Sequence, residues 1–119
     1  MTSASEPPRK VLVVEDVALI RMTIMDMAEQ LGFAAAEAAD AVEALAILQK
    51  DDEIEILLTD LGMPGMSGRE LVEETLRLKP GMKVIIASGY STNAEEFPSN
   101  VSTLTKPFDM QRLRRALES

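Results

Sequence analysis

The strongest indication of the fold comes from residues 54–68, which read Ile54-Glu55-Ile56-Leu57-Leu58-Thr59-Asp60-Leu61-Gly62-Met63-Pro64-Gly65-Met66-Ser67-Gly68. An apolar run leads into Asp60, and a segment rich in turn-forming residues follows it. Continuous apolarity over a short run is typical of a parallel strand that is buried on both faces. Open α/β sheets place their sites beyond the carboxyl ends of such strands. Asp60 is therefore predicted to serve a site there, as a metal ligand, a general base or a covalent nucleophile.

The segments on either side of this stretch alternate between strands and helices. Strands are predicted at 11–14, 33–38, 54–59, 83–87 and 101–105, and helices at 17–31, 40–50, 67–78 and from Asp109 onward. Asp40 and Asp109 are the expected caps of the second and the last helix. The residues expected to face inward are Leu19 or Ile20, Ile24, Met27 or Ala28, and Leu31 in the first helix, and Ala41, Leu45 and Leu48 in the second. Repeated right-handed crossovers then give an α/β fold, a parallel sheet covered by helices on both faces. The fifth strand is polar and is expected near an edge of the sheet. The stretch 90–100 is the least regular, so a helix there should be short or irregular.

Composition narrows the class of protein. The 119 residues suggest one domain, with 1–9 as a disordered lead-in and 10–119 as the folded unit. Cysteine and histidine are both absent, which excludes disulfides, the usual zinc sites, Ser-His-Asp chemistry and a phosphohistidine within this chain. The lack of cysteine suits the reducing cytoplasm. A net charge of −8 argues against binding of nucleic acid or an anionic membrane, and no apolar stretch is long enough to span a bilayer.

Charged and hydroxyl side chains stand where four of the predicted strands end. They are Glu15-Asp16, Asp60, Ser88 and Lys106, after the first, third, fourth and fifth strands. All of these ends open on the same edge of a parallel sheet. Three carboxylates gathered there repel one another, and a hard divalent cation such as Mg²⁺ relieves that repulsion. Lys106 adds a point charge suited to an anion, and Ser88 adds a hydroxyl donor.

This combination of side chains suits phosphoryl transfer. A metal ion and a lysine neutralise the charge that spreads over the phosphoryl oxygens. Asp60 is then expected to act as the nucleophile and to become an aspartyl phosphate. The chain has no glycine-rich loop of the Walker type and no histidine, so the phosphodonor must be another molecule.

At this point the chain resembles the receiver domain of bacterial two-component response regulators. The matching pieces are Val13-Val14-Glu15-Asp16, Thr59 to Gly68, Ala87-Ser88-Gly89-Tyr90 and Lys106-Pro107-Phe108, and the resemblance runs from about Lys10 to the C-terminus. It implies the CheY-like, flavodoxin-like order of strands 2-1-3-4-5. It also implies a cytoplasmic signalling domain that is not an enzyme beyond its own phosphorylation and dephosphorylation.

The resemblance implies a role for each matching residue. Asp60 is the expected phosphoacceptor. Asp16 is expected to bind Mg²⁺ directly and Glu15 through water, with Asp60 and the Gly62 carbonyl as further ligands. Ser88 is the expected switch hydroxyl. Lys106 is expected to pair with a phosphoryl oxygen, and the Lys106-Pro107 bond is expected to be cis. The implied partners are a histidine kinase or phosphotransfer protein as donor and a downstream protein target.

Two features depart from the family pattern. Many members carry an aromatic switch residue three positions before the lysine, where this chain has Thr103. Tyr90 or Phe97 is a hypothetical substitute for that aromatic residue. The stretch from Ser88 to Lys106 is also shorter than is common, by about one helical turn. Both departures concern how a signal leaves the site rather than how Asp60 is phosphorylated.

Each site residue also has an ordinary structural explanation. Glu15-Asp16 alone suggests a solvated strand end, Ser88 a turn serine and Lys106 a surface lysine. Asp60 also suits an Asx-turn, although Ser67 is already present to cap the following helix. The joint occurrence of these residues at successive strand ends favours the functional interpretation.

Three other functions remain as alternatives. A phosphatase of the haloacid dehalogenase type also forms an aspartyl phosphate. The pattern of that family has a second Asp two residues after the nucleophile, where this chain has Gly62. A flavodoxin-like cofactor binder is opposed by the acidic strand ends. A receiver that acts as an interaction domain without phosphorylation, or one that belongs to a hybrid histidine kinase, keeps the same fold.

Overall fold

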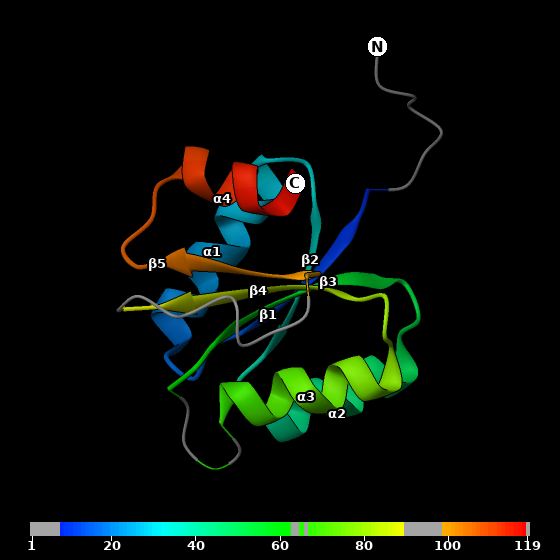
Figure 1. Cartoon of the computed structure of the whole chain (residues 1–119). Coiled ribbons are helices and arrows are strands. Elements are labelled where there is room, and N and C mark those ends of the chain that lie inside the picture. The colour runs from blue at the N-terminus through cyan, green and yellow to red at the C-terminus, as the bar shows by residue number, and fades with distance from the viewer. Residues whose placement is uncertain (1–7, 63–64, 66, 90–98, 119) are drawn as a thin grey trace.

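The computed structural model describes residues 8–62, 65, 67–89 and 99–118. The described residues form one parallel sheet of five strands in the order β2-β1-β3-β4-β5. The strands are β1 (Lys10–Val14), β2 (Ala34–Ala38), β3 (Ile54–Asp60), β4 (Lys83–Ser88) and β5 (Val101–Thr105), and the helices are α1 (Ala18–Gln30), α2 (Ala41–Lys50), α3 (Gly68–Leu78) and α4 (Met110–Glu118). Figure 1 shows α1 and α4 on one face of the sheet and α2 and α3 on the other. The predicted fold class and strand order are confirmed.

At their carboxyl ends, β3 and β4 run one residue further than the sequence predicted. Asp60 is the last residue of β3 and pairs with Ala87, and Ser88 is the last residue of β4 and pairs with Thr105. Both were expected just after their strands. The ladder continues to these residues because each has a neighbouring strand to pair with. As a result, the backbones of Asp60 and Ser88 are held by the sheet rather than by a loop.

The helix boundaries follow the local capping signals. The Asp40 side chain accepts a hydrogen bond from the Glu43 amide at the start of α2. Ser67 and Glu70 form a reciprocal capping box at the start of α3. At the start of α4, the Asp109 carboxylate accepts a hydrogen bond from the Arg112 amide at 2.9 Å. The predicted caps at Asp40, Ser67 and Asp109 are therefore confirmed, and they fix how each helix leaves its loop.

The sheet separates two apolar cores. Alternation along β1 illustrates the division, because Leu12 and Val14 pack toward α2 and α3 whereas Val11 and Val13 pack toward α1 and α4. All four of these side chains are fully buried. Burial on both faces explains the continuous apolar run in the sequence. The polar strand β5 lies at an edge of the sheet, as predicted.

The inward faces of the first two helices differ in part from the prediction. In α1 the buried residues are Ile24 and Ala28, whereas Leu19 and Ile20, one of which was predicted to face inward, are 74% and 40% exposed. In α2 the buried residues include Ala44, and the expected Leu45 is only partly buried. A helical period identifies an apolar stripe, but contact with the sheet decides which part of the stripe is covered.

Two predicted segments lie outside the described residues. The short or irregular helix predicted between β4 and β5 falls mainly in 90–98, and most of the lead-in falls in 1–7. The division of the chain into 1–9 and 10–119 therefore stays a prediction. Within the described part of the chain, no helix has the length and apolar character needed to cross a membrane.

Candidate functional site

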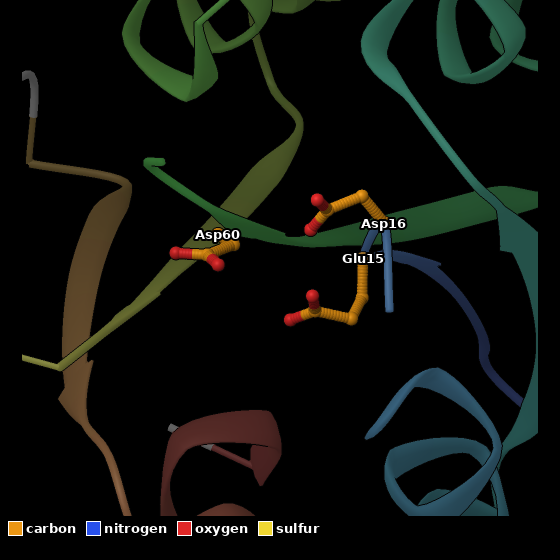
Figure 2. A group of neighbouring side chains, drawn as sticks. All are labelled: Glu15, Asp16 and Asp60. Carbon is orange, nitrogen blue, oxygen red and sulfur yellow. The ribbon is translucent and has the colours of Figure 1, made fainter. Parts of the chain in front are cut away.

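Three carboxylates meet at the carboxyl edge of the sheet. Glu15 and Asp16 follow β1, and Asp60 ends β3, its neighbour in the sheet. One oxygen atom from each carboxylate lies within 4.8 Å of the others. Figure 2 shows the three side chains around one shared space. The structure thus brings together the three acids that the sequence placed at strand ends.

Lys106, which directly follows the carboxyl end of β5, completes this cluster. Its Nζ atom lies 2.9 Å from Glu15 Oε1 and 3.3 Å from Asp60 Oδ2. The side chains of Lys106 and Asp60 are about one-fifth exposed, at 22% and 20%, whereas that of Glu15 is only 3% exposed. The ammonium group therefore bridges a buried carboxylate and an accessible one.

The surroundings of Lys106 act on its pKa in opposite directions. Burial lowers the pKa of the ammonium group, whereas hydrogen bonding and charge attraction from Glu15 and Asp60 raise it. The net effect is a pKa above the ordinary value for lysine. The side chain consequently stays positively charged throughout the neutral pH range.

Both oxygens of the Glu15 carboxylate already have protein partners. Oε1 accepts from Lys106 at 2.9 Å, and Oε2 accepts from the Val17 amide at 3.2 Å. Asp16, by contrast, is an exposed residue beside this pair. The expectation that Asp16 binds a metal ion directly and Glu15 through water stays a prediction.

The Asp60 carboxylate is oriented by the turn that follows it. Its Oδ1 atom accepts a hydrogen bond from the Gly62 amide at 3.3 Å, and its Oδ2 atom faces Lys106. The Asx-type contact of Asp60, which is its ordinary structural role, is thus present together with the charged cluster. Gly62 lies next to the site as predicted, and a role for its carbonyl oxygen as a metal ligand stays a prediction.

Ser88 lies at the same edge of the sheet, between the ends of β3 and β5. It is 3% exposed, and its backbone oxygen accepts a hydrogen bond from the Lys106 amide at 2.6 Å. The Lys106-Pro107 peptide bond is cis, as predicted. Ser88 and Lys106 are therefore joined through their backbones at this edge of the sheet, and their roles as switch hydroxyl and phosphate-binding lysine stay predictions.

The position of the missing aromatic residue lies next to these strand ends. Thr103 is partly buried in β5 and pairs with Ile86 of β4. The two aromatic residues considered as substitutes, Tyr90 and Phe97, lie outside the described residues. The hypothesis that either one replaces the switch aromatic stays a prediction.

Sequence reasoning missed two residues that support the site. Arg21 of α1 donates to the Glu15 carbonyl at 2.7 Å and to Glu37 at 2.8 Å. For Arg21, the only signal in the sequence was Glu37, an acidic residue within an alanine-rich strand. Such a residue is expected to have a basic partner. At Gly68, a Cβ atom would lie 2.2 Å from the Asp60 carbonyl oxygen. A single sequence shows that a glycine is present there but not which backbone approaches it.

The donor set at this edge fits a hard divalent cation. Clustered carboxylates are the ligands that Mg²⁺ prefers, together with carbonyl oxygens and water. Within the described residues, Glu15, Asp16 and Asp60 are the group of acids that can share an ion. One lysine offsets only part of their summed charge, so a cation is electrostatically favoured there.

Comparison with known proteins agrees with this geometry. The chain belongs to the response regulator receiver domain family, whose model matches residues 11–118. It is thus a receiver domain of the two-component signalling class. It is 30% identical over 114 residues to the chemotaxis protein CheY of Thermotoga maritima, covering 92% of this chain and 94% of that one. It is also 35% identical over 108 residues to the sensor kinase CckA of Brucella abortus, covering 87% of this chain but only 11% of the kinase.

Solved structures show the same likeness. The receiver domain of the hybrid histidine kinase CckA is similar with a TM-score of 0.79 and 29% identity, covering 92% of this chain and 95% of that one. The response regulator TrrA of Thermotoga maritima, solved in complex with Mg²⁺-BeF, has a TM-score of 0.83 and 25% identity, covering 92% and 96%. The fold is therefore shared with a response regulator and with the receiver domain of a hybrid histidine kinase.

Proposed function

We propose that Asp60 accepts a phosphoryl group from a phosphohistidine on a partner protein. The observation that carries this proposal is the cluster itself: Lys106 Nζ lies 3.3 Å from Asp60 Oδ2, beside the acids Glu15 and Asp16. A nucleophilic carboxylate needs nearby positive charge to stabilise the transferred group. The Lys106 ammonium group supplies positive charge beside Asp60, and the Asp60 side chain is accessible at the carboxyl edge of the sheet.

The transfer consists of one bond broken and one bond formed. The histidine N–P bond breaks, an Asp60 carboxylate oxygen forms the new O–P bond, and the nitrogen keeps the electron pair of the broken bond. Lys106 then has a phosphoryl oxygen within reach as a stronger partner than the Asp60 carboxylate. The Ser88 hydroxyl is proposed to donate to the same group, and the β4–β5 side of the domain then carries the signal to a downstream target.

We propose Mg²⁺ as the cation of this site. Asp16 and Asp60 would hold it directly, Glu15 would contact it through water, and the Gly62 carbonyl would be a further ligand. The ion supplies charge neutralisation during transfer. Without it, the mutual repulsion of the acids and the incoming phosphoryl group opposes the reaction.

The same chemistry makes the domain a phosphoacceptor rather than an enzyme that turns over a separate substrate. The competing haloacid dehalogenase proposal needs an acid at position 62, where the chain has Gly62. An interaction domain that works without phosphorylation is opposed by the complete set of charged groups. We also retain a cytoplasmic location as a prediction.

Incubation with acetyl phosphate and Mg²⁺ tests the proposed function. Intact-mass measurement should show one added phosphoryl group that hydroxylamine removes, and chelation of Mg²⁺ should abolish the addition. Asp60→Asn should remain unmodified because an amide is not a nucleophile of this kind. The proposal fails if the wild-type protein stays unmodified, or if Asp60→Asn is labelled as fast as the wild type. Steady turnover of a generic phosphate ester would instead support the phosphatase.

The partner that donates the phosphoryl group is proposed to dock on the start of α1. Apolar side chains are exposed there, with Val17 at 47%, Leu19 at 74% and Ile20 at 40%. Leu19 and Ile20 also line an apolar pocket with Pro107 and Phe108, which directly follow Lys106. A donor histidine must approach Asp60 from a surface beside the site, and this apolar surface adjoins it through Lys106.

Leu19→Ser tests this docking surface. Transfer from a histidine-phosphorylated protein that labels the wild type should slow by at least about fivefold, the effect of losing roughly 1 kcal/mol at an interface. Labelling by acetyl phosphate should be unchanged because no docking is needed. Val42→Ser removes a similarly exposed apolar side chain, 68% exposed on α2, and serves as the control. Equal slowing by both variants, or none by Leu19→Ser, would exclude this surface.

Receiver domains similar to this chain occur both as stand-alone proteins and as parts of much longer chains. Its relatives include a chain of nearly the same length and a sensor kinase of which it spans 11%. A stand-alone regulator and a receiver within a hybrid histidine kinase use the same Asp60 chemistry. The proposed function holds for either arrangement.

A further inference from the structure

Arg21 connects the acidic site to β2, the outer strand next to β1. From α1, its Nε atom donates to Glu37 Oε1 of β2 at 2.8 Å, and its NH1 atom donates to the Glu15 carbonyl oxygen at 2.7 Å. The Arg21 side chain is only 15% exposed. A nearly covered guanidinium with two short, charge-assisted contacts is fixed in direction.

The contact with the Glu15 carbonyl acts on the metal-binding segment. That carbonyl belongs to the peptide unit that joins Glu15 to Asp16, and a peptide unit is planar. Fixing the carbonyl therefore also fixes the direction in which the chain enters Asp16. On the other side, the Glu15 amide donates to the Ala38 carbonyl at 3.1 Å. Lys106 and the Val17 amide hold the Glu15 side chain, whereas Arg21 holds the Glu15 carbonyl, beyond the end of the β-ladder.

We propose that Arg21 is a positioning residue that sets the Mg²⁺ affinity of the site by holding the Glu15-Asp16 peptide unit. Glu37 orients the guanidinium for this task. The proposal rests on the proposed Mg²⁺-dependent phosphoacceptor function. Neither Arg21 nor Glu37 belongs to the acid cluster itself, so the effect is exerted through the backbone.

Binding of Mg²⁺ to the Arg21→Met variant, measured by calorimetry, tests this proposal. Methionine keeps the unbranched apolar stem but cannot donate, so the peptide unit loses its restraint. Mg²⁺ affinity should fall by about tenfold, the lower end of the effect of removing a group that supports metal ligands. The rate of labelling by acetyl phosphate should return to the wild-type maximum at high Mg²⁺. A loss of affinity with a preserved maximal rate distinguishes positioning from direct chemistry.

Arg9→Met is the matched control. Arg9 also pairs with a strand glutamate, Glu55, at 3.3 Å, but this pair is exposed and lies at the other end of the sheet. Its loss should leave Mg²⁺ affinity unchanged. Denaturant unfolding in the presence of a chelator gives the stability of each variant separately. A stability loss in Arg21→Met with wild-type Mg²⁺ affinity would show a purely structural role and overturn the proposal.

Two further outcomes are distinguishable. If Arg21→Met does not fold, Arg21→Lys decides, because it keeps the charge but lacks the two-pronged donor; wild-type Mg²⁺ affinity in that variant overturns the proposal. If the wild-type protein itself neither binds Mg²⁺ nor becomes labelled, the proposed function has failed, and the failure is not specific to Arg21.

Discussion

Lys106 pairs with two carboxylates at once, and this double pairing determines what phosphorylation can change. Glu15 is buried and has a second donor in the Val17 amide, whereas Asp60 is accessible and is oriented on one side only by the Gly62 amide. A phosphoryl group added to Asp60 therefore competes for the lysine on the accessible side. The buried contact with Glu15 can meanwhile keep the lysine near the site.

Replacement of Lys106 by methionine should destabilise the metal-free protein. It removes the cation 2.9 Å from the buried Glu15 carboxylate and leaves the three acids without compensation. We expect a loss of about 1–3 kcal/mol in the free energy of unfolding, as for other buried groups deprived of a partner. Added Mg²⁺ should stabilise Lys106→Met more than the wild type, because the ion replaces the lost charge. Denaturant unfolding with and without Mg²⁺ measures both effects.

The pH dependence of this difference follows from the raised pKa of Lys106. A raised pKa in the folded state means that the stabilisation is fully present below the ordinary lysine pKa of about 10.4 and is lost as the pH rises through the higher folded value. The stability difference between wild type and Lys106→Met should therefore be flat across the neutral range and shrink only in strong alkali. A difference that disappears near neutral pH would contradict this account.

At the scale of elements, the start of α3 is packed directly against the end of β3. The Gly68 amide donates to the Leu61 carbonyl at 3.0 Å. A Cβ atom on Gly68 would meet the Asp60 carbonyl oxygen at 2.2 Å and the Leu61 Cα atom at 2.6 Å. Both are backbone atoms of the segment that carries the proposed nucleophile. The absence of a side chain at Gly68 thus allows α3 to begin in close contact with the backbone of Asp60 and Leu61.

Gly68→Ala should therefore disturb both stability and phosphorylation. We expect a loss of about 1–3 kcal/mol, typical of overpacking, and slower labelling by acetyl phosphate because the backbone of Asp60 must move. Gly81→Ala is the control, since a Cβ there meets nothing within 4 Å, and it should change stability by less than about 0.5 kcal/mol. Thermal unfolding and labelling rates measure the two effects. Equal behaviour of the two variants would contradict the packing argument.

The elements that the sequence predicted best are those with local signals. Asp40, Ser67 and Asp109 each cap a helix through contacts within a few residues, which a sequence displays directly. The prediction that Leu19 or Ile20 faces inward was wrong, since both side chains are exposed. A helical period contains no information on what covers each part of the apolar stripe. The extension of β3 to Asp60 depended on a neighbouring strand, which a local pattern also does not contain.

At the scale of the whole molecule, the sheet explains why residues far apart in the sequence form one site. Parallel strands bring their carboxyl ends to one edge, so Glu15, Asp16, Asp60, Ser88 and Lys106 were predictable as a group. Two cores, one on each face of the sheet, hold these strands in register. The contacts of Arg21 were not predictable, because they depend on how α1 is placed over the edge strand β2.

A crystal structure with Mg²⁺ and fluoroberyllate, a mimic of the phosphoryl group, would show whether Asp60 is the phosphoacceptor. We predict beryllium bound to an Asp60 carboxylate oxygen, Mg²⁺ contacted by Asp16 and Asp60, and Lys106 shifted from the Asp60 carboxylate to a fluorine atom, with the Ser88 hydroxyl directed to the same group. Fluoroberyllate bound elsewhere, or an Asp60 carboxylate left unmodified with Lys106 in its original place, would contradict the proposal that Asp60 is the phosphoacceptor.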